Sequence, residues 1–129
     1  MIQLFLAFAL ALFGSAAAAE WVKVNDNADY IAYADPATIA RTGDLVQMHD
    51  LIDLKSPRVS PYGNAHASSM AHSEFDCASP RMRTLAFTLH AGQMGNGELV
   101  ETAAKSNGWL PIFPGTLLGM LWQFACGPA

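Results

Sequence analysis

The sequence predicts an α+β fold, an antiparallel β-sheet meander of about five or six strands with one C-terminal α-helix packed on it. Two observations support this class. From Trp21 onward, segments of alternating polar and apolar residues are separated by turn-forming residues, as in a meander. Over residues 117–126 the apolar spacing changes to that of a helix. A chain of 129 residues without an internal repeat fits one domain of modest core.

Residues 1–19 precede this domain and are typical of a secretory signal peptide. Residues 2–13 are almost wholly apolar and residues 14–19 are small, so we place cleavage near Ala19 and assign the domain to residues 20–129. The apolar stretch is shorter than the ~20 residues that span a bilayer. Because no Lys or Arg precedes it, a retained membrane anchor stays an alternative. We expect an exported bacterial protein in the periplasm, at the cell surface or secreted, with no transmembrane segment after cleavage.

The charge of the chain argues against nucleic acid as a partner. All seven Lys and Arg and all eleven Asp and Glu follow the leader, so the mature domain keeps the net charge of −4. Phosphate backbones are bound by basic surfaces, which this composition does not favour. No glycine loop of the P-loop or dinucleotide-binding type occurs, and we expect no cofactor.

Two short strands and a turn open the domain. Residues 21–24 alternate, and residues 30–34 form a second strand after turn-forming residues 25–27. Asp35, Pro36 and Gly43 are the residue types expected at a helix cap, at a first helical position and at a helix stop. The sequence therefore predicts a single helical turn over residues 35–43.

Three longer strands and a loop follow. Residues 44–54 alternate with one polar face, and only Asp50 falls among the apolar positions. Residues 55–64 are rich in Pro, Gly and Ser, which predicts a surface loop and a candidate for contacting a partner. Residues 66–77 and 81–90 alternate on either side of a turn at residues 78–80.

The C-terminal third is expected to finish the sheet and add the helix. A turn at residues 95–97 leads into a shorter strand over residues 98–102, and an extended apolar segment occupies residues 109–113. The helix then starts at residues 114–116 and runs to about Cys126. Its apolar stripe requires burial against the sheet, and the three tryptophans are expected to anchor the core. They are Trp21, Trp109 and Trp122.

Cys77 and Cys126 are the two cysteines of the chain. An even number of cysteines in an exported protein is most simply paired, and a disulfide would hold the end of the helix to a turn of the sheet. Closing a loop of this length contributes roughly 4 kcal/mol in the chain-entropy model. A pair of free structural thiols, or a catalytic or metal-binding Cys77 with His72 nearby, are the alternatives.

Two groups of polar side chains are candidate binding sites. The first is basic, brackets the predicted loop and the cysteine turn, and could present a positive patch to acidic stretches of a protein partner. It comprises Lys55, Arg58, Arg81 and Arg83. The plainer interpretation is a solvated surface balanced by neighbouring acids such as Glu74 and Asp76.

The second group is made of histidines that fall on one outward face of three consecutive strands if the register is regular, and it could bind zinc or copper. It comprises His49, His66, His72 and His90. Histidines that are simply exposed are the alternative.

Catalysis has only weak candidates in this sequence. Aspartates surround His49 as a conceivable acid–base group, and Ser73 lies next to His72 as a conceivable nucleophile pair. Neither arrangement has a nucleophile-elbow glycine motif or a spacing that forces the side chains together. We therefore predict no catalytic residue and no enzyme.

Several features in order along the chain resemble the bacterial surface-adhesin E family. They are Trp21, the Tyr33–Pro36 stretch YADP, the segment SEFDC at residues 73–77, the turn GNG at residues 95–97, Trp109, PGT at residues 114–116, and Cys126. The resemblance covers essentially all of the mature chain. It implies a small antiparallel sheet with a C-terminal helix tied back by a disulfide.

The resemblance also implies a non-catalytic protein-binding module. The founding adhesin attaches bacteria to host extracellular-matrix and plasma proteins such as vitronectin and laminin, and self-associates, so a homodimer is expected. That adhesin carries a lipid anchor, whereas this chain has no Cys near Ala19. The alternative function is a periplasmic accessory protein, or one that binds a small ligand or metal through the histidine-bearing sheet face.

Overall fold

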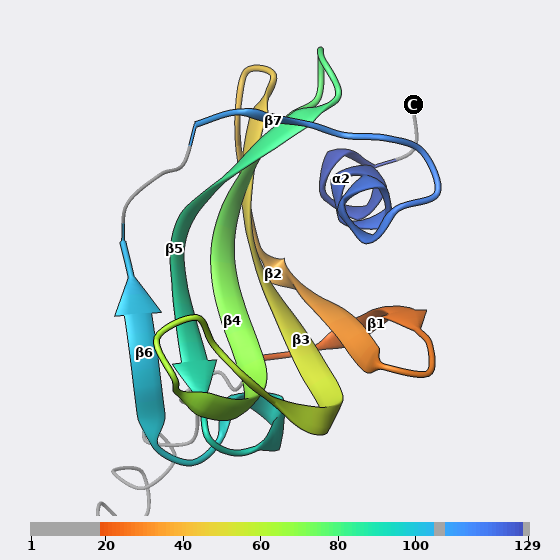
Figure 1. The fold of residues 1–129 in the computed structure, drawn as a ribbon. Helices are drawn as coiled ribbons and strands as arrows, with labels where there is room; N and C mark the ends of the chain where they lie inside the picture. Colours follow the sequence, from red (N-terminus) through yellow and green to blue (C-terminus); the bar gives the residue numbers. More distant parts are fainter. Residues whose placement is uncertain (1–18, 105–107, 128–129) are drawn as a thin grey trace, which may run out of the picture.

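The structure is a computed structural model that describes residues 19–104 and 108–127, which form an antiparallel sheet and a C-terminal helix (Figure 1). The predicted leader, residues 1–19, lies outside the described residues except for Ala19. The elements are β1 Val22–Asp26, β2 Tyr30–Thr42, β3 Leu45–Val59, β4 Ala65–Asp76, β5 Arg81–His90, the 3₁₀ turn η2 Gln93–Gly95, β6 Leu99–Ala103, β7 Leu110–Pro111 and α2 Leu117–Cys126. The predicted fold class is confirmed.

The strands follow one another across the sheet in the order β1-β2-β3-β4-β5-β6, each antiparallel to the next. The short β7 returns to pair with the start of β5. In Figure 1 the sheet curves strongly, and α2 lies on its concave side. No helix among the described residues has both the length and the hydropathy needed to cross a bilayer.

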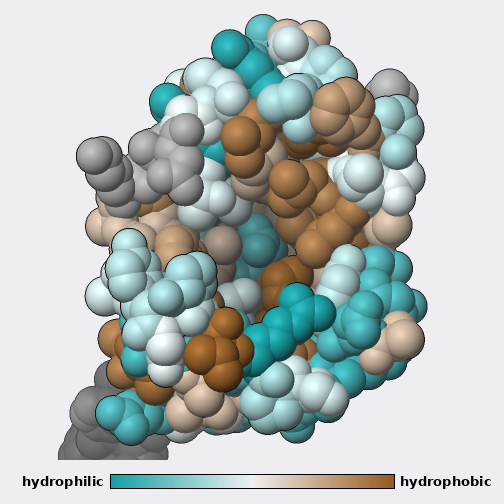
Figure 2. Space-filling view, in the orientation of Figure 1, coloured by the Kyte–Doolittle hydropathy of each residue, from teal (hydrophilic) through white to brown (hydrophobic). Residues whose placement is uncertain are grey.

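The two faces of the sheet differ in what covers them. On the helix face, Met48, Ser73 and Phe75 point towards α2, whereas the intervening residues such as His72 and Glu74 point to the outer face. The core between helix and sheet is a cluster of buried residues: Ala34, Val46, Met48, Phe75, Met82, Ile112, Leu121 and Ala125. Figure 2 shows this side of the molecule, where hydrophobic residues gather over α2 and the surface over β1 is mainly hydrophilic.

Local chemistry places the ends of α2. The Thr116 side chain caps the helix by accepting a hydrogen bond from the Gly119 N–H at 3.1 Å. A side chain at Gly119 would lie 2.7 Å from the Phe113 carbonyl oxygen, so only glycine lets the helix start so close to the preceding segment. The predicted helix and its start are confirmed.

The outer face is covered at one end by the segment around η2. The Ser68 hydroxyl donates to the Gly92 carbonyl at 2.6 Å and accepts from the Gly95 N–H at 2.9 Å. The Met94 N–H donates to the Asp53 carboxylate at 2.8 Å. These bonds fold the β5–β6 connection back onto β3 and β4, which leaves the other half of the outer face open.

The predicted helical turn over residues 35–43 is wrong, because β2 continues to Thr42. The local signals at Asp35 act differently: its carboxylate accepts from the Ala37 N–H at 3.0 Å, and the Thr38 hydroxyl donates to its carbonyl at 2.7 Å. These bonds make an irregularity in the strand, after which Ala40 pairs with Gln47 and the ladder resumes.

The predicted loop over residues 55–64 is also too long, since β3 extends to Val59. The remaining connection is held by Glu101 of β6, whose carboxylate accepts from the Ser60 hydroxyl at 2.7 Å and from the Asn64 amide at 3.0 Å. These two hydrogen bonds lower the pKa of Glu101. The β3–β4 connection is therefore fixed to the far edge of the sheet.

Candidate binding surface

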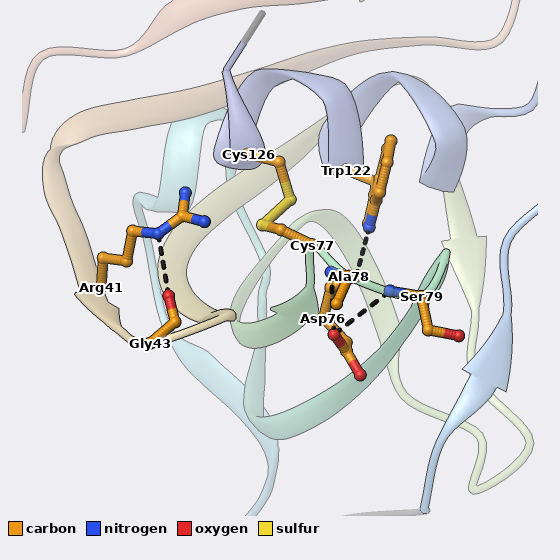
Figure 3. The surroundings of a disulfide bond; sticks show 8 residues. All are labelled: Arg41, Gly43, Asp76, Cys77, Ala78, Ser79, Trp122 and Cys126. Carbon is orange, nitrogen blue, oxygen red and sulfur yellow. Dashed lines mark hydrogen bonds between the residues drawn. A yellow bond between two sulfur atoms is a disulfide. The ribbon is translucent and has the colours of Figure 1, made fainter. Parts of the chain in front are cut away.

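The disulfide between Cys77 and Cys126 is confirmed, and it joins the turn after β4 to the end of α2 (Figure 3). In Figure 3, Trp122 points from α2 to the same turn, where its indole N–H donates to the Asp76 carbonyl at 2.8 Å. Both cysteines are bonded, so the chain has no free thiol in this state. The alternatives of a catalytic or metal-binding Cys77 do not fit this pairing.

Beside this turn, two arginines of β5 pair with two acids of β4 on the outer face. The short turn sets the register, so that Arg81 lies opposite Asp76 and Arg83 opposite Glu74. Nε of Arg81 donates to the Asp76 carboxylate at 2.9 Å, and Nε of Arg83 donates to the Glu74 carboxylate at 2.8 Å. Each guanidinium is therefore held in one orientation by its cross-strand partner.

Trp109 completes this arrangement. Its ring lies 4.4 Å from the Arg81 guanidinium carbon and 4.5 Å from that of Arg83, within the range of cation–π contacts. Because β7 pairs with the start of β5, the residue before β7 reaches the outer face at this point. We call the set of Glu74, Asp76, Arg81, Arg83 and Trp109 the arginine–tryptophan surface.

The charges on the arginine–tryptophan surface nearly cancel. The hydrogen bond from Arg81, followed by the N–H groups of Ala78 and Ser79, lowers the pKa of Asp76 and keeps its carboxylate ionised. Glu74 is bound by Arg83 and also accepts from the Gln47 amide at 3.3 Å. Two cations thus face two anions, which gives a surface of directional donors without a large positive field.

The four predicted basic residues do not form one patch. Lys55 forms an ion pair with Asp26 at 2.8 Å, and Arg58 lies opposite His66 at the far end of β4. Asp76 lies ten positions after His66 along β4, which is about 33 Å of strand at about 3.3 Å per residue. Arg81 and Arg83 therefore belong to a different surface from Lys55 and Arg58.

The structure brings together two of the four predicted histidines. His49 and His72 are direct cross-strand neighbours on the outer face, with ring centroids 4.7 Å apart and planes at 70°. His66 instead contacts the Asn64 carbonyl at 3.1 Å, and His90 contacts the Thr88 hydroxyl at 2.8 Å. No group of three or more His, Cys, Asp or Glu within the described ranges is placed to hold a metal ion.

The histidine pair borders a hollow of about 190 Å³ on the sheet. Met70, Ala86, Thr88 and Thr102 are among the other residues that line it. Partial burial, followed by the nearby His49, lowers the pKa of His72, and Glu74 opposes this effect. The hollow adjoins the arginine–tryptophan surface, because His72 and Glu74 are successive outward residues of β4.

The conceivable catalytic groups are not assembled. Ser73 points to the helix face and donates to the Asp50 carboxylate at 3.1 Å, whereas His72 points to the outer face. Successive residues of a strand face opposite sides, so Ser73 and His72 cannot form a pair, and neither can Asp50 and His49. Asp53 is bound by the Met94 N–H and serves the fold.

Trp109 is the functional candidate that the sequence interpretation missed. It was expected in the core, but it is only half buried and lies on the outer face against two arginines. The available signal was the symmetry of Glu74 and Asp76 with Arg81 and Arg83 about a short turn, which predicts two cross-strand ion pairs. Nothing local in the sequence brings residue 109 to them.

Comparison with known proteins identifies the family. The model of the family described as surface-adhesin protein E matches residues 21–127. The chain belongs to the surface-adhesin protein E family. This agrees with the resemblance found in the sequence and covers the whole sheet, the helix and both cysteines.

Solved structures of Haemophilus influenzae protein E share the fold. One crystal form matches with a TM-score of 0.60 and 18% sequence identity, over 85% of this chain and 96% of that chain. A second structure matches with a TM-score of 0.58 and 18% identity, over 82% of this chain and 92% of that chain. A search of curated proteins finds no match.

Membership of the surface-adhesin E family has functional consequences at a coarse level. It supports a surface-adhesin-like, exported or surface protein, and it indicates protein partners in preference to catalysis. A fold can carry many functions, so membership of the family does not by itself identify a binding surface.

Proposed function

We propose that this surface-adhesin-like protein binds a host extracellular-matrix or plasma protein through the arginine–tryptophan surface. The observation that supports this most is the contact of Trp109 with two arginines, each already oriented by an acid. Trp and Arg are the side chains that most often dominate binding energy at protein interfaces. Here they occur together on an open part of the sheet.

Pre-ordering of these side chains favours tight binding. Free arginine and tryptophan side chains lose rotamer freedom on association, about 0.5–1.5 kcal/mol for each immobilised side chain. In this protein Asp76 and Glu74 hold the two guanidinium groups before any partner arrives. The side chains of Arg81 and Arg83 remain 44% and 34% exposed, so N–H groups are left for a partner.

The balance of charge predicts the character of the interaction. Two arginines offset by two carboxylates exert little long-range attraction, so binding relies on burial of the Trp109 ring and on short hydrogen bonds. Affinity should therefore fall only modestly with salt. A partner with neutral polar or mixed-charge surface fits better than one with a long acidic stretch.

The place of action is part of the same proposal. A leader cleaved near Ala19 would deliver the domain across the inner membrane, and it would then remain in the periplasm, reach the cell surface or be secreted. Fractionation of cells tests this, because a protein confined to the periplasm cannot meet a host protein.

The experiment measures binding of the oxidised mature domain, residues 20–129, to immobilised vitronectin and laminin. We expect Trp109→Ala and the double variant Arg81→Ala/Arg83→Ala to weaken binding by at least 10-fold. The matched control is Lys55→Ala/Arg58→Ala, which removes the same type of charge from the other end of the sheet and should bind like the original. Far-ultraviolet circular dichroism and the urea midpoint check that each variant keeps its fold.

Two results would contradict the proposal at different levels. Absence of binding to any matrix or plasma protein tested would reject adhesion as the function. Normal binding by the Trp109 variant, with loss in the Lys55/Arg58 control, would keep adhesion and reject this surface.

A further inference from the structure

We propose that His49 and His72 form a binding site for a divalent first-row metal ion, with Cu²⁺ bound most tightly. The site lies on the outer face of β3 and β4 and is separate from the arginine–tryptophan surface in both its residues and its chemistry. It goes beyond protein binding, because the ligand is a metal ion and the donors are two imidazole nitrogens.

The spacing of the rings fits one metal ion held by both. Metal–nitrogen bonds are about 2 Å long, and a ring nitrogen lies about 1.1 Å from the ring centroid, so two imidazoles that meet one ion at 90–110° have centroids roughly 4.5–5 Å apart. The centroids of His49 and His72 are 4.7 Å apart. The two rings of these cross-strand neighbours therefore lie within the range of separations that chelation of one ion requires.

The orientation requires only a side-chain movement. The rings now meet edge to face, with an angle of 70° between their planes. His49 is exposed, so its ring can turn about its side-chain bonds until a nitrogen points to the same place as one of His72. No hydrogen bond to either ring is found among the described residues, in contrast to His66 and His90, whose rings contact Asn64 and Thr88.

The surroundings leave room for the ion and its remaining ligands. Both histidines line the hollow of about 190 Å³, which opens to solvent and can admit water as further ligands. Met70 lines the same hollow, but its sulfur packs against Gly95 of η2, so the remaining ligands are water molecules. Glu74 does not take part, because Arg83 and Gln47 occupy its carboxylate. The affinity of imidazole sites for divalent first-row metal ions increases from Mn²⁺ to Cu²⁺ and is lower again for Zn²⁺.

The test is titration of the mature domain with Cu²⁺ at pH 7.5, by calorimetry and by electron paramagnetic resonance. We expect one saturable site per chain, a spectrum with splitting from two imidazole nitrogens, and weaker binding of Zn²⁺. His49→Ala and His72→Ala should each weaken Cu²⁺ binding at least 10-fold. The matched controls His66→Ala and His90→Ala should leave it unchanged.

Several outcomes would overturn the inference. Failure to saturate, or a spectrum without imidazole splitting, would show that these histidines are merely exposed. Equal losses in the two control variants would place the metal elsewhere. Binding to vitronectin and laminin is measured separately with and without EDTA, so failure of the metal site and failure of adhesion are distinguishable.

Discussion

Replacing Asp50 with Asn should stabilise the protein at neutral and alkaline pH. Asp50 lies on the helix face of β3, between Ala34 and Ala71 of the neighbouring strands, and is 5% exposed. Among the described residues, the hydrogen bond to its carboxylate is the one from the Ser73 hydroxyl at 3.1 Å. Burial with so little compensation raises the pKa of Asp50 from 3.8 to about 7.

The size and sign of the effect follow from this shift. The native state holds the Asp50 proton more tightly than the unfolded chain does, so the favourable contribution is complete below about pH 4 and is lost as pH rises through 7. A rise of about three pKa units corresponds to about 4 kcal/mol. Of this, about 2–3 kcal/mol is lost between pH 5 and pH 8. Asn has nearly the shape of the protonated acid and its side-chain oxygen can still accept from Ser73, but the amide does not ionise in this pH range.

The assay is urea denaturation of the oxidised domain at pH 5 and pH 8, with EDTA present. The stability of Asp50→Asn relative to the original should increase by about 2–3 kcal/mol between the two pH values. The control Glu98→Gln, at an exposed residue, should show no such change. A difference between variant and original that is the same at both pH values would refute the reasoning.

Three further predictions concern stability. Replacing Cys77 and Cys126 with Ser opens a loop with a sequence separation of 49. The free energy of unfolding should fall by about 4 kcal/mol in the chain-entropy model, and an unchanged urea midpoint would contradict this. Gly95→Ala should destabilise the protein more than Gly63→Ala. Both glycines have positive φ, but only the methyl group at residue 95 would lie 2.7 Å from the Met70 sulfur. Equal thermal midpoints of the two variants would contradict this prediction. Trp122→Phe removes the donor to a carbonyl of the cysteine turn and should cost about 1–3 kcal/mol in urea, whereas a neutral change would mean that water replaces the indole.

The regular parts of the fold could be predicted from the sequence because their signals are local and agree with one another. Strands β4 and β5 alternate over long runs on either side of a short turn, and the apolar stripe and the Thr116 cap define α2. An even cysteine count in an exported chain was enough to predict the disulfide. These features do not depend on the register between distant strands.

The errors arose where a distant contact decides the outcome. The cap-like residues at Asp35 predict the start of a helix, but pairing of Ala40 with Gln47 on β3 extends the chain instead. The β3–β4 connection is fixed by Glu101, about forty residues further along the chain. No local pattern reports such contacts.

The candidate sites show the same limit. Both predicted groups contained residues that the structure uses, Arg81 with Arg83 and His49 with His72. Which of these residues lie together depends on the register between strands. Trp109 joins Arg81 and Arg83 on the outer face because β7 returns to pair with β5. Residue types were therefore predictable, whereas their assembly was not.

The central claim, that the arginine–tryptophan surface makes the contact with a partner protein, is tested most directly by amide hydrogen exchange of the domain bound to vitronectin or laminin. We predict that protection on binding concentrates in residues 74–76 and 81–83 and at Trp109 and Leu110, because Pro111 has no amide hydrogen. Protection confined to residues 60–64, the β3–β4 connection, with none around Trp109, would contradict it.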